Sequence, residues 1–174
     1  MASYANRGQN FEAMIEQANE AYLNQGVALI YKIPTPVKVL NNNGGTVTGF
    51  YEKKGAPDYM GVYDQGAICF DAKSTKVETR FDLKNLKKHQ YTFMKNFSIA
   101  GGLAFVLVQF KTLDETYYLP LEKIREYEGY YLNEYSYEGR KSIPYDEIAI
   151  EEHKIEQQGL IALDYLSVIA EVLE

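Results

Sequence analysis

The sequence is poor in the residues that form disulfides and zinc sites. It has one cysteine, Cys69, two histidines and no tryptophan. A single cysteine excludes an internal disulfide and fits a reducing cytoplasm. Its apolar neighbours predict a buried and inert thiol. Two histidines and one cysteine are also too few for a Cys/His zinc cluster, so zinc is not expected.

Long apolar runs are absent as well. No segment approaches the ~18–20 apolar residues that cross a membrane, and residues 1–7 lack the apolar core of a signal peptide. The 174 residues, of which 46% are hydrophobic and 24% charged, are typical of one globular domain with a sizeable core. We therefore expect a single domain over 1–174, located in the cytoplasm.

Positive charge is scarce overall, because the net charge is −6, but it is unevenly distributed. Residues 1–111 contain 13 Lys and Arg against 9 Asp and Glu, a balance of +4. Residues 112–174 contain 5 against 15, a balance of −10. A polyanion such as nucleic acid would bind the first part, and the acidic part would face away from it. An uneven scatter of surface charge explains the same numbers.

The most informative feature that is present is an acidic motif in residues 57–73. Pro57-Asp58 is followed, after a gap, by Asp71-Ala72-Lys73. Side chains alternate along a strand, so Asp71 and Lys73 should point to one face, and a hairpin turn at 63–66 would bring Asp58 beside Asp71. Two adjacent carboxylates repel each other unless a cation lies between them.

Oxygen ligands of this kind favour Mg²⁺, with Mn²⁺ as a substitute, over zinc. Such an ion can act on a phosphodiester, and Lys73 could orient the water or stabilise the charge that grows on the phosphate. An Asp-x-Lys tripeptide is common, however, and most copies are solvated surface charge. The apolar strand 66–70 and the Pro-Asp at hairpin distance favour the catalytic interpretation.

The hydrophobic pattern predicts alternating helices and strands. We expect helices over 9–25, from Phe81-Asp82 to Gly101, over 120–132 and over 162–173, with Asp82 as an N-cap. Buried strands are expected over 27–31 and 103–110, and a short strand over 116–119. Residues 140–148 are expected to form a loop. Glu12, Glu16 and Glu20 form a row with four-residue spacing, which is typical of a solvated helix face. The fold class is α/β, with a mixed central sheet flanked by helices.

Residues 34–56 differ in character from the rest. Their β-like residues flank Asn41-Asn42-Asn43-Gly44-Gly45, and Asn-Gly and Gly-Gly are typical of hairpin tips. We expect a protruding two-stranded arm with few core residues. A flexible surface loop is the alternative.

Several segments together resemble a known family. They are Asn6 to Glu12, Tyr31 to Pro36, Asp58 to Tyr63, Phe70 to Lys76, His89-Gln90, Gly139 to Pro144 and Leu163 to Leu166. They are similar to the RecU-type Holliday junction resolvases of the PD-(D/E)xK nuclease superfamily, and the resemblance spans nearly the whole chain. It implies a restriction-endonuclease-like fold in which the arm is a β-hairpin stalk that enters the junction centre.

The resemblance also implies a homodimeric, Mg²⁺-dependent endonuclease that nicks symmetric strands of four-way junction DNA in recombination and repair. Its partners would include a recombinase or a branch-migration protein. The residues it assigns to the active site are the metal-binding Glu12, Asp58, Asp71 and Ala72, the motif lysine Lys73 and the nearby Gln90. The candidates for DNA contact are Arg7, Lys38, Lys53, Lys54 and Lys76.

Two features depart from the family pattern. The second acid is usually glutamate, whereas here it is the shorter Asp71. The chain also begins close to Asn6-Arg7-Gly8, without a basic N-terminal extension, so we expect a compact version of the family, of a kind that a phage could encode. Two alternatives remain: a PD-(D/E)xK nuclease with another DNA substrate, such as a duplex cutter, and a recombination factor that binds junctions without cleaving them.

Overall fold

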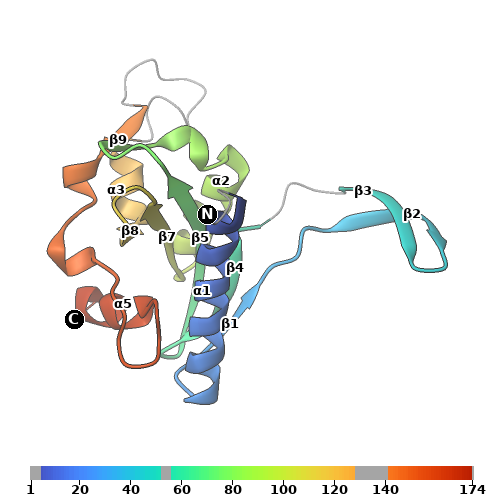
Figure 1. The fold of residues 1–174 in the computed structure, drawn as a ribbon, viewed down its shortest axis with the longest axis horizontal. Coiled ribbons are helices and arrows are strands. Elements are labelled where there is room, and N and C mark those ends of the chain that lie inside the picture. The colour runs from blue at the N-terminus through green and yellow to red at the C-terminus, as the bar shows by residue number, and fades with distance from the viewer. Residues whose placement is uncertain (1–4, 52–55, 128–140, 174) are drawn as a thin grey trace.

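The computed structural model describes the backbone of residues 5–51, 56–127 and 141–173, and their side chains except at 5–10, 51 and 173 (Figure 1). The helices are α1 (Ala5–Asn24), α2 (Lys88–Ile99), α3 (Leu121–Glu126) and α5 (Tyr165–Leu173). The strands are β1 (Ala28–Lys32), β2 (Val37–Asn43), β3 (Thr46–Tyr51), β4 (Tyr59–Tyr63), β5 (Gly66–Thr75), β6 (Arg80–Asp82), β7 (Leu103–Phe110), β8 (Glu115–Pro120) and β9 (Ser142–Pro144). Short 3₁₀ turns lie at Leu83–Asn85, Tyr145–Glu147 and Glu151–His153.

A five-stranded mixed sheet forms the centre of the molecule. Its strand order is β1-β4-β5-β7-β8, with β5 and β7 parallel and the other neighbours antiparallel. The α/β fold class with a mixed sheet is therefore confirmed. Within the described ranges, no helix is both long and apolar enough to cross a membrane.

Helices cover both faces of this sheet. Phe11 and Ile15 of α1 pack on one face together with Leu166 and Ile169 of α5. The opposite face carries α2 and α3, through side chains that include Tyr91, Met94, Leu121 and Ile124. The sheet is thus the middle layer of a three-layer arrangement.

Strand β7 links the two cores, because alternate side chains of a strand point to opposite faces. Phe105 and Leu107 belong to the α1 and α5 side, whereas Val106 and Val108 belong to the α2 and α3 side. The prediction of a central strand over 103–110, apolar on both faces, is confirmed. Cys69 is also buried, as expected, and burial raises the pKa of its thiol to about 12, which makes the thiolate scarce at neutral pH.

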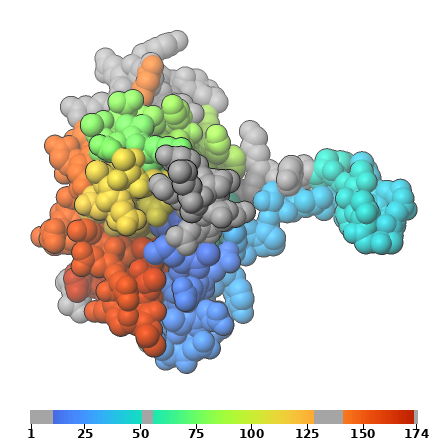
Figure 2. All heavy atoms as spheres, in the orientation of Figure 1, coloured from blue at the N-terminus to red at the C-terminus, as the bar shows by residue number. Residues whose placement is uncertain are grey.

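Strands β2 and β3 form a separate two-stranded sheet that extends away from the body (Figures 1 and 2). Every residue of β2 is exposed, and Val37 is 47% and Phe50 49% exposed. The tip uses Gly44 and Gly45, which both have positive φ. The predicted hairpin conformation is therefore observed, while its role as a stalk stays a prediction.

The sequence misplaced the start of the second helix. Asp82 does not cap α2: it ends β6, which pairs with β9, and precedes the 3₁₀ turn Leu83–Asn85 without forming a side-chain cap hydrogen bond. Its carboxylate instead accepts a hydrogen bond from Arg80 Nε at 2.9 Å. Helix α2 begins at Lys88, after a 3₁₀ turn. The pairing of Phe81 with Ile143 holds this segment extended, because that contact buries both side chains completely.

Five smaller features also differ from the predictions. The first helix begins at Ala5 rather than residue 9, and the last begins at Tyr165 rather than 162. Residues 27–31 were expected to form a buried strand, but β1 lies at the edge of the sheet, with Leu29 and Tyr31 exposed. The predicted loop 140–148 contains β9 and a 3₁₀ turn. Only 121–126 of the predicted helix 120–132 is observed as helix, and residues 128–132 lie outside the described residues.

Candidate active site

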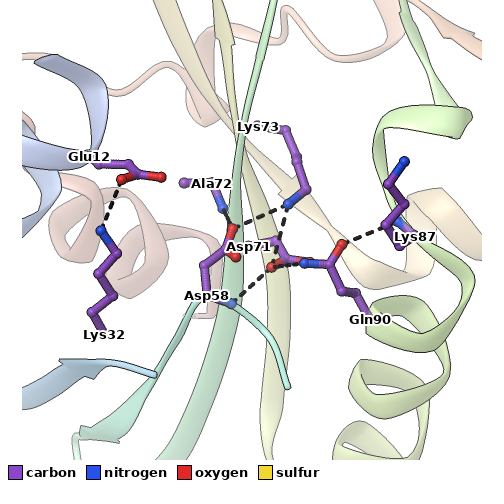
Figure 3. A network of polar contacts seen from close by, with 8 residues as sticks. All are labelled: Glu12, Lys32, Asp58, Asp71, Ala72, Lys73, Lys87 and Gln90. Atoms are coloured by element: carbon purple, nitrogen blue, oxygen red, sulfur yellow. Dashed lines mark hydrogen bonds and ion pairs between the residues drawn. The ribbon is translucent and has the colours of Figure 1, made fainter. Parts of the chain in front are cut away.

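The β4–β5 hairpin places the two motif acids side by side. Asp64 and Gln65 at its turn both have positive φ, which suits a two-residue hairpin turn. The register runs from Tyr63↔Gly66 to Tyr59↔Phe70, so Asp58 and Asp71 lie opposite each other at the far end. The Asp58 backbone N–H donates to Asp71 Oδ1 at 2.9 Å, and the Ala72 N–H donates to Asp58 Oδ2 at 3.2 Å (Figure 3).

Asp71 is fully buried, with a relative exposure of 0%. Burial raises the pKa of its carboxyl to about 7; Lys73 opposes this rise and Asp58 reinforces it. Oδ1 is well occupied, because it accepts hydrogen bonds from the Asp58 N–H and, at 3.0 Å, from Gln90 Nε2. Oδ2 is enclosed and has no hydrogen-bond partner among the described residues. One oxygen of a buried carboxylate is thus left for another ligand.

Lys73 and Gln90 complete the cluster from β5 and α2. Lys73 Nζ lies 3.2 Å from Asp58 Oδ2 and 3.6 Å from Asp71 Oδ1. Asp71 and Lys73 pair with Val106 and Val108, which face α2, so both side chains lie on the α2 side of the sheet. This agrees with the expected alternation around Ala72, which packs against the opposite core.

Gln90 has a second contact that fixes its amide. Its Oε1 accepts a hydrogen bond from the backbone N–H of Lys87 at 3.2 Å, at the first turn of α2. The same side chain therefore satisfies a free N–H at the helix start and donates to Asp71. This contact with Lys87 was not predicted, because the sequence pattern favours a helix that begins earlier, at Phe81-Asp82.

These residues fit a divalent cation. The site offers two carboxylates within contact of each other and one buried carboxylate oxygen without a partner, and hard oxygen donors are the ligands of Mg²⁺ and Mn²⁺. Asp58, Asp71 and Lys73, which the motif predicted to lie together, do so, and Gln90 joins them. Ala72 contributes its backbone N–H to Asp58, and its expected part in metal binding stays a prediction.

Glu12 does not join the two aspartates. Its Oε2 lies 2.9 Å from Lys32 Nζ, and Lys32 also contacts Glu16 Oε1 at 2.9 Å. Among the described residues, no three His, Cys, Asp or Glu side chains gather in a way that could hold a metal ion. Helix α1 covers the face of the sheet opposite to the one from which Asp71 projects. Glu12, Glu16 and Glu20 are exposed, as predicted for a solvated helix face, but Glu12 and Glu16 share a cationic partner that the sequence did not reveal.

The candidate DNA contacts are spread over the molecule. Lys38 lies on β2, with its Nζ 6.0 Å from the centre of the Phe50 ring. Lys76 is exposed just after β5. Arg7 belongs to α1, but its side chain lies outside the described residues, and so do Lys53 and Lys54. Their contact with DNA stays a prediction.

Comparison with known proteins identifies the family. The family model for RecU, recombination protein U, matches residues 6–171. The Holliday junction resolvase RecU of Lactococcus lactis is 36% identical over 180 residues, which cover 100% of this chain and 82% of the relative. The Holliday junction resolvase RecU of Streptococcus gordonii is 36% identical over 176 residues, covering 98% and 85%.

A solved structure is also similar in part. Hjc, a Holliday junction resolvase from Archaeoglobus fulgidus, superposes with a TM-score of 0.41 and 13% identity over 66% of this chain and 77% of that one. The family assignment rests instead on the sequence relatives and on the family model, which extend over almost the entire chain. With its two motif acids, lysine and glutamine gathered at one end of the β4–β5 hairpin, this chain belongs to the RecU family.

Proposed function

We propose that this protein is a structure-specific endonuclease that nicks four-way DNA junctions in a reaction that depends on Mg²⁺. The observation that carries the proposal is the Asp58–Asp71 pair with an unpartnered buried carboxylate oxygen and Lys73 beside it. Its sequence relatives are named Holliday junction resolvases. Together these favour phosphodiester hydrolysis of junction DNA over other metal-dependent reactions.

Asp58 and Asp71 would hold the ion through carboxylate oxygens, with Asp71 Oδ2 as the oxygen that is not already engaged. When bound, Mg²⁺ supplies Lewis-acid stabilisation to the phosphodiester and to the attacking water. The two carboxylates, which repel each other without a cation, would share its charge. The short Asp71 side chain is held in one orientation by two hydrogen bonds to Oδ1, which keeps Oδ2 directed away from them.

Lys73 has the contacts of a charge-stabilising residue. Its ammonium lies within 3.6 Å of both acids, and its side chain is 16% exposed, so it is partly desolvated. A fixed ammonium in such a place stabilises negative charge that develops on a phosphate and can orient a water molecule. Gln90 acts on the same centre through Asp71, whose orientation its amide fixes.

The β2–β3 hairpin supports recognition of the branched substrate. It carries Lys38 and the exposed Phe50 on a ribbon that extends from the body (Figure 2). A cation and an aromatic ring on an exposed ribbon can contact phosphates and unstacked bases. We propose that this hairpin enters the junction centre, where such bases are found.

The symmetry of a four-way junction favours an enzyme with two active sites. A four-way junction has strands related by two-fold symmetry, so a homodimer would place two sites on matching strands. We propose one nuclease domain per chain with the arm as an insertion over 34–56. We also propose action in the bacterial or phage-infected cytoplasm, in contact with a recombinase or a branch-migration protein.

The test is cleavage of end-labelled DNA in Mg²⁺. The four-way junction, the matching linear duplex and the single strand should be incubated with the full chain, and the nicks mapped on each strand. Paired symmetric nicks in the junction alone are expected. Equal cutting of the duplex would instead favour a nuclease with another substrate, and junction binding without any nick would exclude both enzymatic functions.

A further inference from the structure

Lys32 forms a clamp between two acids of α1 that the active-site motif does not include. Its Nζ lies 2.9 Å from Glu12 Oε2 and 2.9 Å from Glu16 Oε1 (Figure 3 shows the first of these contacts). The two acids are one helical turn apart and so share a face of α1. Both raise the pKa of Lys32, which therefore stays charged at any physiological pH.

This clamp lies beside the strand end that carries Asp58. Lys32 pairs with Tyr59 across β1 and β4, and the next N–H, of Ile33, donates to the Asp58 carbonyl at 2.8 Å. The Tyr59 hydroxyl is enclosed and has no hydrogen-bond partner in the described part of the chain. Tyr59 directly follows Asp58 in the chain, so its pairing with Lys32 places the clamp and Asp58 at the same end of the β1–β4 pair (Figure 3).

The clamp does not have the properties of a stabilising salt bridge. The Lys32 side chain is 45% exposed, and those of Glu12 and Glu16 are 49% and 51% exposed. Ion pairs in such exposed positions contribute little to the stability of a fold. Three long side chains held in one arrangement at the edge of an active site are better explained by a requirement for position.

We propose that Lys32 is a positioning residue that holds Glu12 beside Asp58, with Glu16 as the second anchor that keeps Lys32 in place. The proposal rests on the proposed nuclease function. Lys32 is fixed by two anchors, so Glu12 is held on the side of the site opposite Gln90. In Figure 3 Glu12 lies on the other side of Asp58 from Gln90, at the border of the site.

Such a role has a signature that simple structural support lacks. Lys32 is a positive charge beside a cation site, so its removal should strengthen divalent-cation binding, by about 2- to 10-fold from the loss of one charge. The same removal frees Glu12 from its position and should slow nicking at saturating Mg²⁺, by about 10- to 100-fold. The two effects have opposite directions, whereas local unfolding would weaken both properties.

The experiment uses the full chain and four substitutions. Lys32→Met removes the charge but keeps the length, Lys32→Arg restores a cation, and Glu16→Gln removes one anchor. Glu20→Gln is the matched control, because Glu20 is the next exposed acid of the same row. Binding of Mn²⁺ to the metal-free protein is measured by calorimetry, nicking of the junction at saturating Mg²⁺ by gel assay, and folding by thermal melting.

We expect tighter Mn²⁺ binding and slower nicking in Lys32→Met, recovery of nicking in Lys32→Arg, a smaller loss in Glu16→Gln and no change in Glu20→Gln. Nicking by Lys32→Met within about twofold of wild type, or weaker Mn²⁺ binding in a folded Lys32→Met protein, overturns the assignment. A wild-type chain that nicks no DNA contradicts the proposed function itself. A normal wild type with an unaffected Lys32→Met contradicts the role of Lys32 alone.

Discussion

The β2–β3 and β4–β5 hairpins have similar backbones and opposite surroundings. Each is an antiparallel pair whose turn contains two residues with positive φ. In the first, every residue of β2 is exposed. In the second, Tyr59 and Phe70 are fully buried and stack with ring centres 4.8 Å apart. Packing on both faces holds the atoms of β4–β5 in place, whereas the side chains of β2–β3 are exposed to solvent and free to contact a binding partner.

Because of this difference, the two hairpins are suited to different roles. A metal and a phosphate require carboxylate oxygens that do not move, and the buried hairpin supplies them at its open end. A branched DNA requires reach and exposed side chains, which only the hairpin outside the core supplies. Substitutions in β4–β5 should therefore change chemistry and stability, and substitutions in β2–β3 should change selectivity alone.

The largest effect is expected from the two acids. Asp58→Asn or Asp71→Asn should slow junction nicking by at least about 10³-fold, because each removes a ligand charge from the cation site. Junction binding without metal should be retained or strengthened, since one repulsion of phosphate is lost. Asp64→Asn is the matched control: it makes the same change at the turn of the same hairpin, where Asp64 is exposed and Asn tolerates the positive φ. Nicking that survives in either site variant would refute the ligand assignment.

The second effect concerns the stability of the metal-free protein. Burial raises the pKa of Asp71 from the ordinary 3.8 to about 7 in the folded state. The stability associated with its protonation is fully present below about pH 3.8 and is lost as the pH rises through about 7. Relative to Asp71→Asn, the wild type should therefore lose roughly 2–4 kcal/mol of unfolding free energy between pH 4 and 8.

Urea unfolding in a chelator, at several pH values, measures this loss. Asp64→Asn serves again as the control and should show the same pH dependence as the wild type. A constant difference between wild type and Asp71→Asn across this range would mean that the buried carboxyl titrates normally. Addition of Mg²⁺ at pH 8 should restore stability to the wild type and not to Asp71→Asn.

A third effect compares one glycine in each of the two hairpins. A Cβ at Gly61 of β4 would lie 2.1 Å from the Leu29 carbonyl oxygen, and a Cβ at Gly49 of β3 would lie 2.6 Å from the Lys38 carbonyl oxygen. Gly61→Ala must push β1 away from β4 and should destabilise the fold by about 1–3 kcal/mol, a lowering of the melting temperature by roughly 3–10 °C. Gly49→Ala should leave the melting temperature unchanged. Equal melting temperatures for the two variants would show that the hairpins are supported alike.

The smallest effect is expected from a shorter arm. Val39 and Gly49 are register partners, so replacing residues 40–48 by an Asn-Gly turn keeps the base of the hairpin and removes its tip. The melting temperature and the nicking of a nonspecific substrate should not change, while the preference for junction over duplex should fall by about tenfold or less. A preference equal to that of wild type would show that recognition lies elsewhere on the molecule.

The sequence predicted the site well where local rules decide the geometry. The spacing of Asp58 and Asp71 around a tight turn determines their register, and strand alternation places Lys73 on the same face as Asp71. The apolar run 103–110 is long and uninterrupted, so its place in the centre of the sheet was also predictable. These features depend on neighbours within one hairpin or one strand.

Prediction from the sequence failed where a segment far along the chain determines the local conformation or contact. Phe81 and Asp82 have the sequence of a helix start, but β9, which lies some 60 residues further along the chain, holds them in a strand. Glu12 and Glu16 lie on an exposed face, as their spacing predicts, but the contact of both with Lys32 from another element was not predicted. A helix-cap pattern and an acidic row describe only local preference, and neither contains information about a partner that the fold brings in.

At the base of the arm, the Ile33 N–H donates a hydrogen bond to the Asp58 carbonyl. This bond joins the point where the chain leaves the body to the point where it returns. The residues between them form a loop that this bond closes, and the entropy of closing a loop changes by only about 0.6 kcal/mol when its length doubles. The length of the arm can therefore vary among proteins with this architecture while the body hardly changes in stability. In this fold, insertions and deletions in the arm can therefore change how far it extends into a DNA branch point without changing the catalytic residues.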